Sequence, residues 1–580
     1  MCGLAAILAG SRSASPVDGD ELLRIRDAMT ARGPDGAGSW LSPDGRVGLG
    51  HRRLAIIDLS PAGAQPMATE DGRLRIVFNG EIYNYRALRA ELEAEGVRFV
   101  SHTDTEVILR LYRRHGRAML DRLRGMFAFA LWDEQAQGML LARDHFGIKP
   151  LYVADDGATV RVASQVKALL AGGHVDTTPD PAGHAGFFLW GHVPEPHTLY
   201  RGIRALAPGS WLWAGVDGDR VEGRFFDLRG AFSMTTGSAT LHEALRDSVR
   251  HHLEADVPVG VFLSSGLDST TLLALASEAA RQPVRTLTLG FQEFAGTGED
   301  EVPMAESVAA TYGAQHTTRV VGPGDFSHLR QQVLHDMDQP SVDGSNTWLV
   351  ARAAREIGLK VAFSGVGGDE LLGGYDTFHR VPSMVARLSW AAHLPLLGKT
   401  ARHVMAPWIG RITSPKAAGV LELGSDMGGA YLLRRGLFMP WELGEVLDPD
   451  MARTGLATLD TRARLNNSTH GAPNSRVAVS LLEMQWYMRN QLLRDSDWAG
   501  MAHSVEIRVP LVDLGVLAAV APAVTGPNPP TKRDMALAAR PPLPDAIVNR
   551  RKTGFRVPIL EWLGARSLRG WARSIHQSFS

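Results

Sequence analysis

The sequence has very little cysteine. Among 580 residues only Cys2 carries a thiol, which excludes an intramolecular disulfide framework and any cysteine-rich zinc or iron–sulfur site. No uninterrupted apolar run reaches the ~18 residues that suggest a membrane-spanning helix, and no basic leader precedes the short apolar run at the start. These absences predict a cytoplasmic protein with no membrane partner.

An excess of charge is lacking as well. The 61 Lys and Arg residues stand against 62 Asp and Glu residues, a net charge of -1. Such a chain has no global attraction for nucleic acid, so no nucleic-acid partner is expected. Hydrophobic residues make up 44% of the chain, as in ordinary globular proteins, and the length alone predicts about four domains.

The first two hundred residues are predicted to form short strands and a few helices. Strands are expected at 3–8, 54–57, 74–78, 126–132 and 139–141, with helices at 84–96 and 105–117. This order is typical of a layered α+β domain. Residues 194–237 are rich in Gly, Pro and Trp, and we interpret them as a connection between domains.

After residue 241, continuous apolar strands alternate with helices. Strands are expected at 257–263, at 284–289, up to 321 and at 360–363. This alternation indicates a parallel sheet covered on both faces, with ligands bound beyond the carboxyl ends of its strands. Two Ser-Gly loops, at 264–266 and 364–365, would lie there, and the remainder from 375 to 580 is mostly helical by pattern.

The single cysteine stands directly behind the initiator Met. Removal of Met1 is expected because the next residue is small, and Cys2 would then carry a free α-amine. With an unperturbed pKa of about 7.7–8.0, this amine can accept the thiol proton without a histidine. The alternative is an accidental cysteine at a frayed terminus, but the apolar run places the terminus on a strand. We therefore interpret Cys2 as a nucleophile.

Five further segments accompany Cys2-Gly3. They are 32–36 (RGPDG), 51–56 (HRRLAI), 63–67 (GAQPM), 78–84 (FNGEIYN) and 101–106 (SHTDTE). Taken singly, Asn79-Gly80 is also a turn dipeptide, Asp104 a helix cap and Arg53 a surface charge. Taken together and in this order, the segments resemble the glutaminase domain of class II amidotransferases, whose nucleophile is amino-terminal.

That resemblance implies a role for each matched residue. The side-chain amide of Asn79 and the backbone N–H of Gly80 would form the oxyanion hole, and glutamine would be bound by Arg53, Ile56, Asn79, Glu81 and Asp104. The chemistry agrees, because a zwitterionic amino acid needs a guanidinium at one end and a carboxylate at the other. An acyl-transfer oxyanion likewise needs preorganised donors.

The loop at 264–269 (SSGLDS) follows a predicted strand and opens a helix. Backbone N–H groups at such a helix start point at an anion, and Asp268 can hold Mg²⁺ on phosphates. A well-capped helix is the alternative for this loop alone. The loop resembles the pyrophosphate loop of ATP pyrophosphatases, with Ser265 in place of a glycine.

The second loop, at 363–375 (FSGVGGDELLGGY), resembles the signature of asparagine synthetases, and matches continue at 338–345, 501–513 and 551–558. The resemblance implies Mg²⁺ at Asp268 and Asp369, with Lys552 as a catalytic residue that neutralises phosphate charge. It implies an ATP site made by Phe262, Leu263, Ser264, Ser265, Gly266, Asp268, Ser269, Leu289, Ser364 and Gly365.

Val366 is the serious departure from that signature. Well-studied members of the family carry a Glu at the position of Val366. Val366 and Arg508 are both expected at the acceptor site. Valine cannot bind a cation, accept a proton or hydrogen-bond through its side chain. Either another group has taken over the role of the Glu, or the amide acceptor differs.

The resemblance extends over almost the whole chain and implies its architecture. We expect a four-layer αββα sandwich of Ntn-hydrolase type at 1–209, a linker at 210–238, and an α/β parallel-sheet nucleotide-binding domain with helical additions at 239–580. The first domain would hydrolyse glutamine. The second would use ATP and Mg²⁺ to adenylate the β-carboxylate of aspartate, giving asparagine, glutamate, AMP and pyrophosphate. Small-molecule substrates are thus the expected partners, and the resemblance allows a homodimer.

Three alternatives remain. The first is a related amide-forming enzyme that acts on another carboxylate, which Val366 motivates. The second is a β-lactam-synthetase-like relative without glutaminase function, against which the intact set of glutaminase residues argues. The third is a non-catalytic protein that uses ATP as a ligand, which predicts no release of pyrophosphate.

Overall fold

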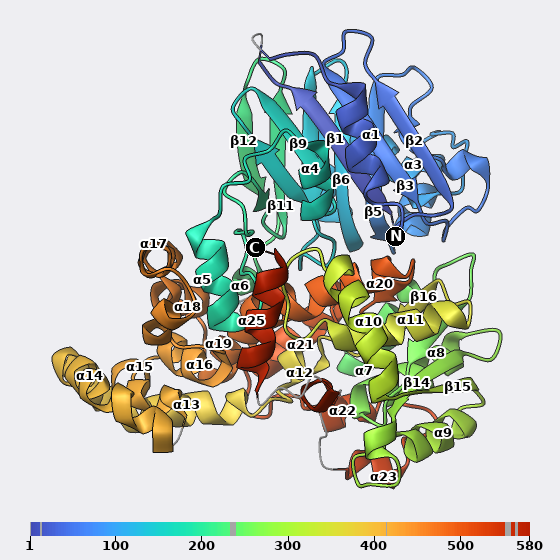
Figure 1. The fold of residues 1–580 in the computed structure, drawn as a ribbon. Helices are drawn as coiled ribbons and strands as arrows, with labels where there is room; N and C mark the ends of the chain where they lie inside the picture. The colour runs from blue at the N-terminus through green and yellow to red at the C-terminus, as the bar shows by residue number, and fades with distance from the viewer. Residues whose placement is uncertain are drawn as a thin grey trace.

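The structure is a computed structural model that describes residues 2–11, 14–232, 239–412, 414–550, 558–562 and 567–579. An upper unit built on two antiparallel sheets stands on a lower unit built on a parallel sheet (Figure 1). The amino-terminus lies at the edge of the upper unit that faces the lower unit (Figure 1).

The two sheets of the upper unit have six strands each. Their orders are β10-β8-β9-β1-β3-β2 and β12-β11-β7-β6-β5-β4. The strands are β1 (Gly3–Ala9), β2 (Gly36–Leu41), β3 (Val47–Arg53), β4 (Met67–Ala68), β5 (Leu74–Ile82), β6 (Gly125–Asp133), β7 (Gly138–Arg143), β8 (Tyr152–Asp155), β9 (Thr159–Ala163), β10 (Arg204–Ala205), β11 (Ser210–Gly215) and β12 (Arg220–Arg224). Alternate apolar residues such as Leu4, Val77 and Leu141 fill the space between the sheets.

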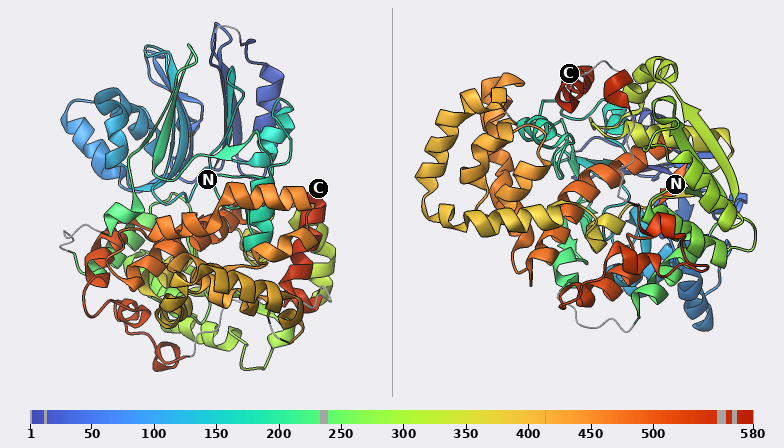
Figure 2. Two further views of the ribbon diagram at one scale, coloured as in Figure 1. Left: turned by 90° about the vertical axis from the view of Figure 1, so that its left-hand side faces the viewer. Right: turned by 90° about the horizontal axis from the view of Figure 1, so that it is seen from below.

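Helices cover the outer faces of both sheets. Helices α1 (Gly19–Asp27) and α4 (Val166–Gly172) pack on the first sheet, and α2 (Tyr85–Ala94) and α3 (Asp104–His115) pack on the second. The left view of Figure 2 shows the two sheets side by side between these helices. Helix α5 (Pro181–Trp190) leaves the unit and packs on α17 (Pro449–Leu459) of the lower unit.

Two expectations for this unit need correction. The strand expected at 54–57 is wrong, because β3 ends at Arg53 and the chain then leaves the sheet. Leu54 and Ile56 pack instead with Val361 and Met501 of the lower unit. Residues 210–224, which we expected in a linker, form β11 and β12, and β11 pairs with β7. Their Gly-rich and Trp-rich composition concealed two short strands at the edge of a sheet.

The sheet of the lower unit is parallel throughout, as predicted, with the order β15-β14-β13-β16-β17. Its strands are β13 (Val259–Phe262), β14 (Arg285–Phe291), β15 (Gln315–Val321), β16 (Val361–Phe363) and β17 (Glu506–Arg508). The helices between or beside these strands are α7 (Leu241–His252), α8 (Leu267–Ala279), α9 (Val302–Thr311), α10 (Pro323–Asp336), α11 (Ser345–Glu356), α12 (Gly368–Leu372) and α20 (Arg494–Ala502).

The rest of the lower unit is helical. It includes α13 (Thr377–Leu388), α14 (Pro395–Ile412), α16 (Met427–Arg435), α18 (Thr461–Thr469), α19 (Ser475–Leu482), α21 (Leu514–Val524), α22 (Lys532–Ala536) and α25 (Leu568–Phe579). A π-helical segment, η7 (Glu483–Leu493), runs directly into α20. Across the described ranges, every helix is too short or too polar to span a bilayer.

Candidate active sites

Cys2 lies directly before β1 and is buried, with 8% of its surface exposed. Its backbone N–H donates to Asn79 Oδ1 at 3.0 Å, and its Sγ lies 4.0 Å from the carbonyl oxygen of Leu54. Burial raises the pKa of the Cys2 thiol, so the thiol keeps its proton until a base removes it. The free α-amine that could serve as this base exists only once Met1 is removed.

Asn79 and Gly80 lie on β5, beside Cys2. The Asn79 side chain is fully buried, and its Nδ2 donates to no residue in the described part of the chain. A buried amide donor beside a nucleophile is suited to receive an oxyanion. Gly80 has φ +153°, and a Cβ there would lie 2.1 Å from the carbonyl oxygen of Met126, so only glycine fits.

Arg53 and Asp104 offer opposite charges near this point. Arg53, at the end of β3, donates from Nη1 to the carbonyl oxygen of Ser60 at 2.8 Å, and no carboxylate of the described residues forms an ion pair with it. Asp104 opens α3 and accepts a hydrogen bond from the Ile82 N–H at 2.9 Å. Burial raises the pKa of Asp104 to about 6.

Glu81 and Ile56 bring the lower unit into contact with this site. Glu81 Oε1 lies 3.5 Å from Nη2 of Arg508 on β17, and burial raises the pKa of Glu81 well above its ordinary value. Ile56 is buried, and its carbonyl oxygen accepts a hydrogen bond from the Asp256 N–H at 2.9 Å. The upper site is therefore partly enclosed by the lower unit.

A buried ion pair ties the nucleophile to helix α20. Arg32 donates from Nε to the Cys2 carbonyl oxygen at 3.1 Å, and its Nη1 and Nη2 donate to Asp497 at 2.7 and 3.1 Å. Ser496, the residue before Asp497, lines a cavity in the lower unit. A single helix therefore contacts the surroundings of both sites.

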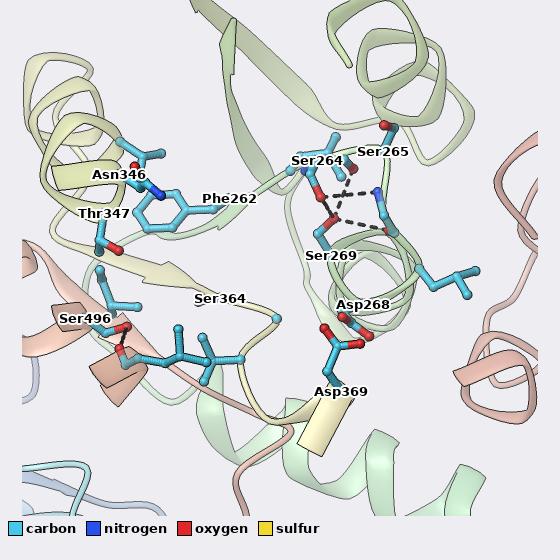
Figure 3. Close-up of a pocket in the computed structure, with 18 of the residues that line it drawn as sticks. Phe262, Ser264, Ser265, Asp268, Ser269, Asn346, Thr347, Ser364, Asp369 and Ser496 are labelled. Atoms are coloured by element: carbon cyan, nitrogen blue, oxygen red, sulfur yellow. Dashed lines mark hydrogen bonds between the residues drawn. The ribbon is translucent and has the colours of Figure 1, made fainter. Parts of the chain in front are cut away.

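That cavity, of about 470 Å³, opens at the carboxyl ends of β13 and β16 (Figure 3). All ten residues expected to bind ATP line it. Gly266 N–H donates to Ser264 Oγ at 3.2 Å, and the hydroxyls of Ser264 and Ser269 lie 2.9 Å apart (Figure 3). Ser265 takes the place of a glycine without adopting a positive φ, so the departure costs no left-handed strain.

Asp268 and Asp369 meet around one ammonium group. Lys532 Nζ lies 2.5 Å from Asp268 Oδ2 and 2.6 Å from Asp369 Oδ1. A Cβ at Gly365 would lie 2.7 Å from Asp268 Cβ, so glycine permits this close approach of the two loops. The two carboxylates already share one cation position, and this oxygen donor set fits Mg²⁺. Within the described ranges no larger group of His, Cys, Asp or Glu side chains is arranged to hold a metal ion.

Several cavity residues were not found from the sequence. They include Lys532, Arg550, Asp495 and Glu370. Burial raises the pKa of Glu370 to about 7, and likewise that of Asp495. Only Glu370 stood inside a matched motif, whereas the other three come from segments far from both loops, which the fold brings together.

The acceptor residues are divided between two places. Val366 lines the cavity, but Arg508 does not. Arg508 is fully buried, and its Nε donates to Glu506 Oε1 at 2.6 Å. Its Nη2 lies near Glu81 of the upper unit and not in the cavity. Its expected contact with the acceptor therefore has no counterpart in this geometry. Lys552 lies outside the described residues.

Comparisons with known proteins found similar proteins for both parts of the chain. Residues 1–225 match the family described as "Glutamine amidotransferase domain", and residues 240–578 match "Asparagine synthase". A putative glutamine-hydrolysing asparagine synthetase of Mycobacterium tuberculosis is 35% identical over 99% of this chain and 90% of its own length. The glutamine-hydrolysing asparagine synthetase 1 of Bacillus subtilis is 32% identical over 100% of this chain and 90% of its own length.

A solved structure is also similar in part. Glutamine phosphoribosylpyrophosphate amidotransferase from Bacillus subtilis shares 18% sequence identity and a TM-score of 0.30, over 64% of this chain and 76% of that one.

The buried Cys2 of the upper unit and the cavity between the two Ser-Gly loops of the lower unit fit the two matched families, and together these define the chain as an amidotransferase with a synthetase domain. The chain belongs to the asparagine synthase family and carries an amino-terminal glutamine amidotransferase domain. The prediction of an ATP-dependent carbon–nitrogen ligase with glutamine as amido donor is confirmed at this level.

Proposed function

We propose that the chain makes asparagine from aspartate, glutamine and ATP. In this proposal the upper unit is a four-layer αββα domain of Ntn-hydrolase type that releases ammonia, and the lower unit consumes it. The observation that carries the proposal is the presence in one chain of the Cys2–Asn79 contact and a cavity lined by both Ser-Gly loops.

In the upper unit, Cys2 Sγ attacks the side-chain amide carbon of glutamine. The α-amine of the processed Cys2 takes the thiol proton and returns it to the leaving ammonia, which leaves a glutamyl thioester that water hydrolyses to glutamate. Asn79 Nδ2, which no described residue accepts from, and Gly80 N–H would stabilise the oxyanion.

Substrate charge is matched at both ends of glutamine. Arg53 would bind the α-carboxylate, and Asp104 with Glu81 would bind the α-ammonium, while Ile56 forms an apolar wall. The absence of an ion pair on Arg53 among the described residues supports its part in this assignment.

In the lower unit, the phosphates of ATP would contact the serine loop, which comprises Ser264, Ser265, Gly266 and Ser269. The adenine would lie against the apolar residues that line the cavity. Figure 3 shows Phe262 across the cavity from the serine loop. The remaining contacts come from Leu263, Leu289, Ser364 and Gly365. A β-carboxylate oxygen attacks the α-phosphorus, pyrophosphate leaves, and ammonia then displaces AMP from the acyl-adenylate.

Positive charge in this cavity would offset the phosphate charge. Asp268 and Asp369 would hold Mg²⁺, which when bound neutralises phosphate oxygens as a Lewis acid. Lys532 lies between the same carboxylates, and Lys552 is proposed from its motif alone to stabilise the departing pyrophosphate.

A second candidate reaction differs only in its acceptor. Val366 lines the cavity with a side chain that can neither bind a cation nor accept a proton. Glu370, with its pKa near 7, could take over as base, and a carboxylate other than that of aspartate is the alternative substrate.

One incubation separates these reactions. The protein, with Met1 removed, is given glutamine, ATP, Mg²⁺ and aspartate, and the products are identified by mass spectrometry. Asparagine with AMP and pyrophosphate is expected, whereas glutamate without asparagine would reject aspartate as acceptor. Val366→Glu should change the rate or the choice of acceptor, and an unchanged rate would show that this position is silent.

A cytoplasmic location and a homodimer complete the proposal. The reduced cytoplasm would keep the Cys2 thiol as a free nucleophile. Cell fractionation and sedimentation velocity test these two points independently of the reaction.

A further inference from the structure

An arginine-lined cavity lies apart from both sites. It measures about 300 Å³ and is formed by the end of β12 with the segment that follows it, by helix α18, by the π-helical segment η7 and by Glu195. None of its lining residues lines the cavity that we assign to ATP. Arg224, Arg229, Arg464 and Arg489 all face it.

Two of these arginines have no carboxylate partner in the described part of the chain. Arg464 donates from Nη2 to the carbonyl oxygen of Glu195 at 2.8 Å, and its guanidinium lies 5.3 Å from the ring centroid of Trp486. The only hydrogen bond of Arg489 to a described residue runs from Nε to the carbonyl oxygen of Phe146, at 3.4 Å. Both guanidinium groups are therefore held in place without being neutralised.

Desolvation acts on both groups. Burial lowers the pKa of Arg464, and it lowers that of Arg489 to about 10. Such a shift reflects the free energy needed to keep a charge out of water, and for Arg489 it persists although the Glu195 carboxylate attracts the guanidinium. A bound anion would remove this penalty.

The remaining charges leave the cavity positive. Arg224 and Arg229 share Asp227, at 4.0 and 3.4 Å. Glu195 is the other carboxylate that lines the cavity. It already forms an ion pair at 2.9 Å with Arg143, a residue that does not line the cavity. A ligand with a single negative charge would leave part of this excess unmatched.

A neutral donor points to the same kind of ligand. The Nε2 of Gln485, another lining residue, is buried and donates to no described residue. A buried donor without an acceptor is costly, and an oxygen of a bound anion would satisfy it.

We propose that this cavity binds a small oxyanion with two or more negative charges, of which a phosphate group is the type, and that Arg464 and Arg489 are its main ligands. The planar guanidinium fork matches paired oxygen atoms, which phosphates and dicarboxylates both present. The site does not depend on the reaction proposed above, because it shares no residue with either active site.

The test is calorimetric titration of the full-length protein with inorganic phosphate at constant ionic strength, with succinate and chloride in parallel. Phosphate or succinate should bind, and Arg464→Gln and Arg489→Gln should each weaken that binding at least tenfold. Arg453→Gln, a highly exposed arginine on α17, should leave it unchanged. Lys532→Met should also leave it unchanged, since that residue lies in the ATP cavity.

Two results would overturn the proposal. One is binding that disappears in Lys532→Met but survives in Arg489→Gln, because the anion would then occupy the ATP cavity. The other is no binding of either dianion to the wild-type protein.

If the glutamine variants fail to fold, the wild-type protein is treated with phenylglyoxal and the modified arginines are mapped by mass spectrometry. Phosphate should protect Arg464 and Arg489 but not Arg453. Equal modification of all three with and without phosphate would reject the site.

Discussion

At the scale of single residues, Asn79 serves two purposes with one amide. Its oxygen accepts the Cys2 N–H, and its nitrogen donates to nothing in the described part of the chain. Asn79→Asp keeps an oxygen acceptor of the same shape, removes the donor and places negative charge where the oxyanion would form. We expect kcat for glutamine hydrolysis to fall by about 10²- to 10³-fold, as for other oxyanion-hole donors.

Synthesis driven by added ammonium is the internal control for Asn79→Asp. It should stay near the wild-type rate, because the lower cavity is unchanged. A variant that hydrolyses glutamine at the wild-type rate would show that Asn79 does not contact the oxyanion.

Asp104 gives the upper site a dependence on pH. Burial raises its pKa to about 6, and only its deprotonated form can bind the α-ammonium of glutamine. Below pH 6 the free site therefore gains a proton that must leave before glutamine binds. The α-amine of Cys2 also titrates, so both proteins lose activity as the pH falls. Below pH 6, the plot of log kcat/KM against pH should be steeper for the wild-type glutaminase than for Asp104→Asn, by one unit of slope. Parallel profiles for the two proteins would contradict this assignment.

At the scale of elements, helix α20 connects the two units through the Arg32–Asp497 ion pair, which is almost fully buried. Arg32→Leu leaves Asp497 with Lys149 at 3.8 Å as its remaining ion-pair partner. Removing one member of a buried pair typically costs about 3–5 kcal/mol, so we expect a clearly lower thermal unfolding midpoint and slower glutamine hydrolysis. Scanning calorimetry and a glutaminase assay measure both effects.

In a double-variant cycle, Arg32→Leu/Asp497→Leu should lower the free energy of unfolding by less than the sum of Arg32→Leu and Asp497→Leu, because the second change no longer removes a partner that the first residue still needs. The loss of the contact between Lys149 and Asp497 is common to both Asp497 variants and cancels in the cycle. Arg86→Leu breaks the exposed contact with Glu254 that also joins the two units, and it should change stability by less than about 1 kcal/mol. If Arg32→Leu and Arg86→Leu lower the free energy of unfolding equally, burial of the Arg32–Asp497 pair is not the cause of the loss.

The elements also show what the sequence could reveal. The parallel sheet and both Ser-Gly loops followed from apolar runs of the right length, since period and turn residues are local properties. The contact of Lys532 with Asp268 joins residues 264 apart in the chain, and no local pattern encodes it. Strands β11 and β12 were missed for a related reason, because β11 pairs with β7, which lies far away in the sequence, and β12 pairs only with β11.

At the scale of the whole molecule, neighbouring residues of β17 contact both sites. Strand β17 lies between them, since Ile507 lines the cavity that we assign to ATP while Arg508, the next residue, contacts Glu81, which lies near Asn79 on β5. An internal passage of ammonia needs only a short path in such an arrangement. Its alternative is release to solvent, where ammonia would be diluted and largely protonated.

A mixing experiment distinguishes these two routes. Cys2→Ala should lose glutamine-dependent synthesis but keep synthesis from added ammonium, and Lys532→Met should keep glutamine hydrolysis but lose synthesis. If ammonia stays inside one molecule, a mixture of the two variants will turn glutamine into glutamate while forming amide far more slowly than the wild type. Added ammonium should then restore amide formation by Cys2→Ala in the same tube. Amide formation by the mixture at the wild-type rate would mean that ammonia travels through solvent. The contact between β17 and the upper unit would then serve only to hold the two units together.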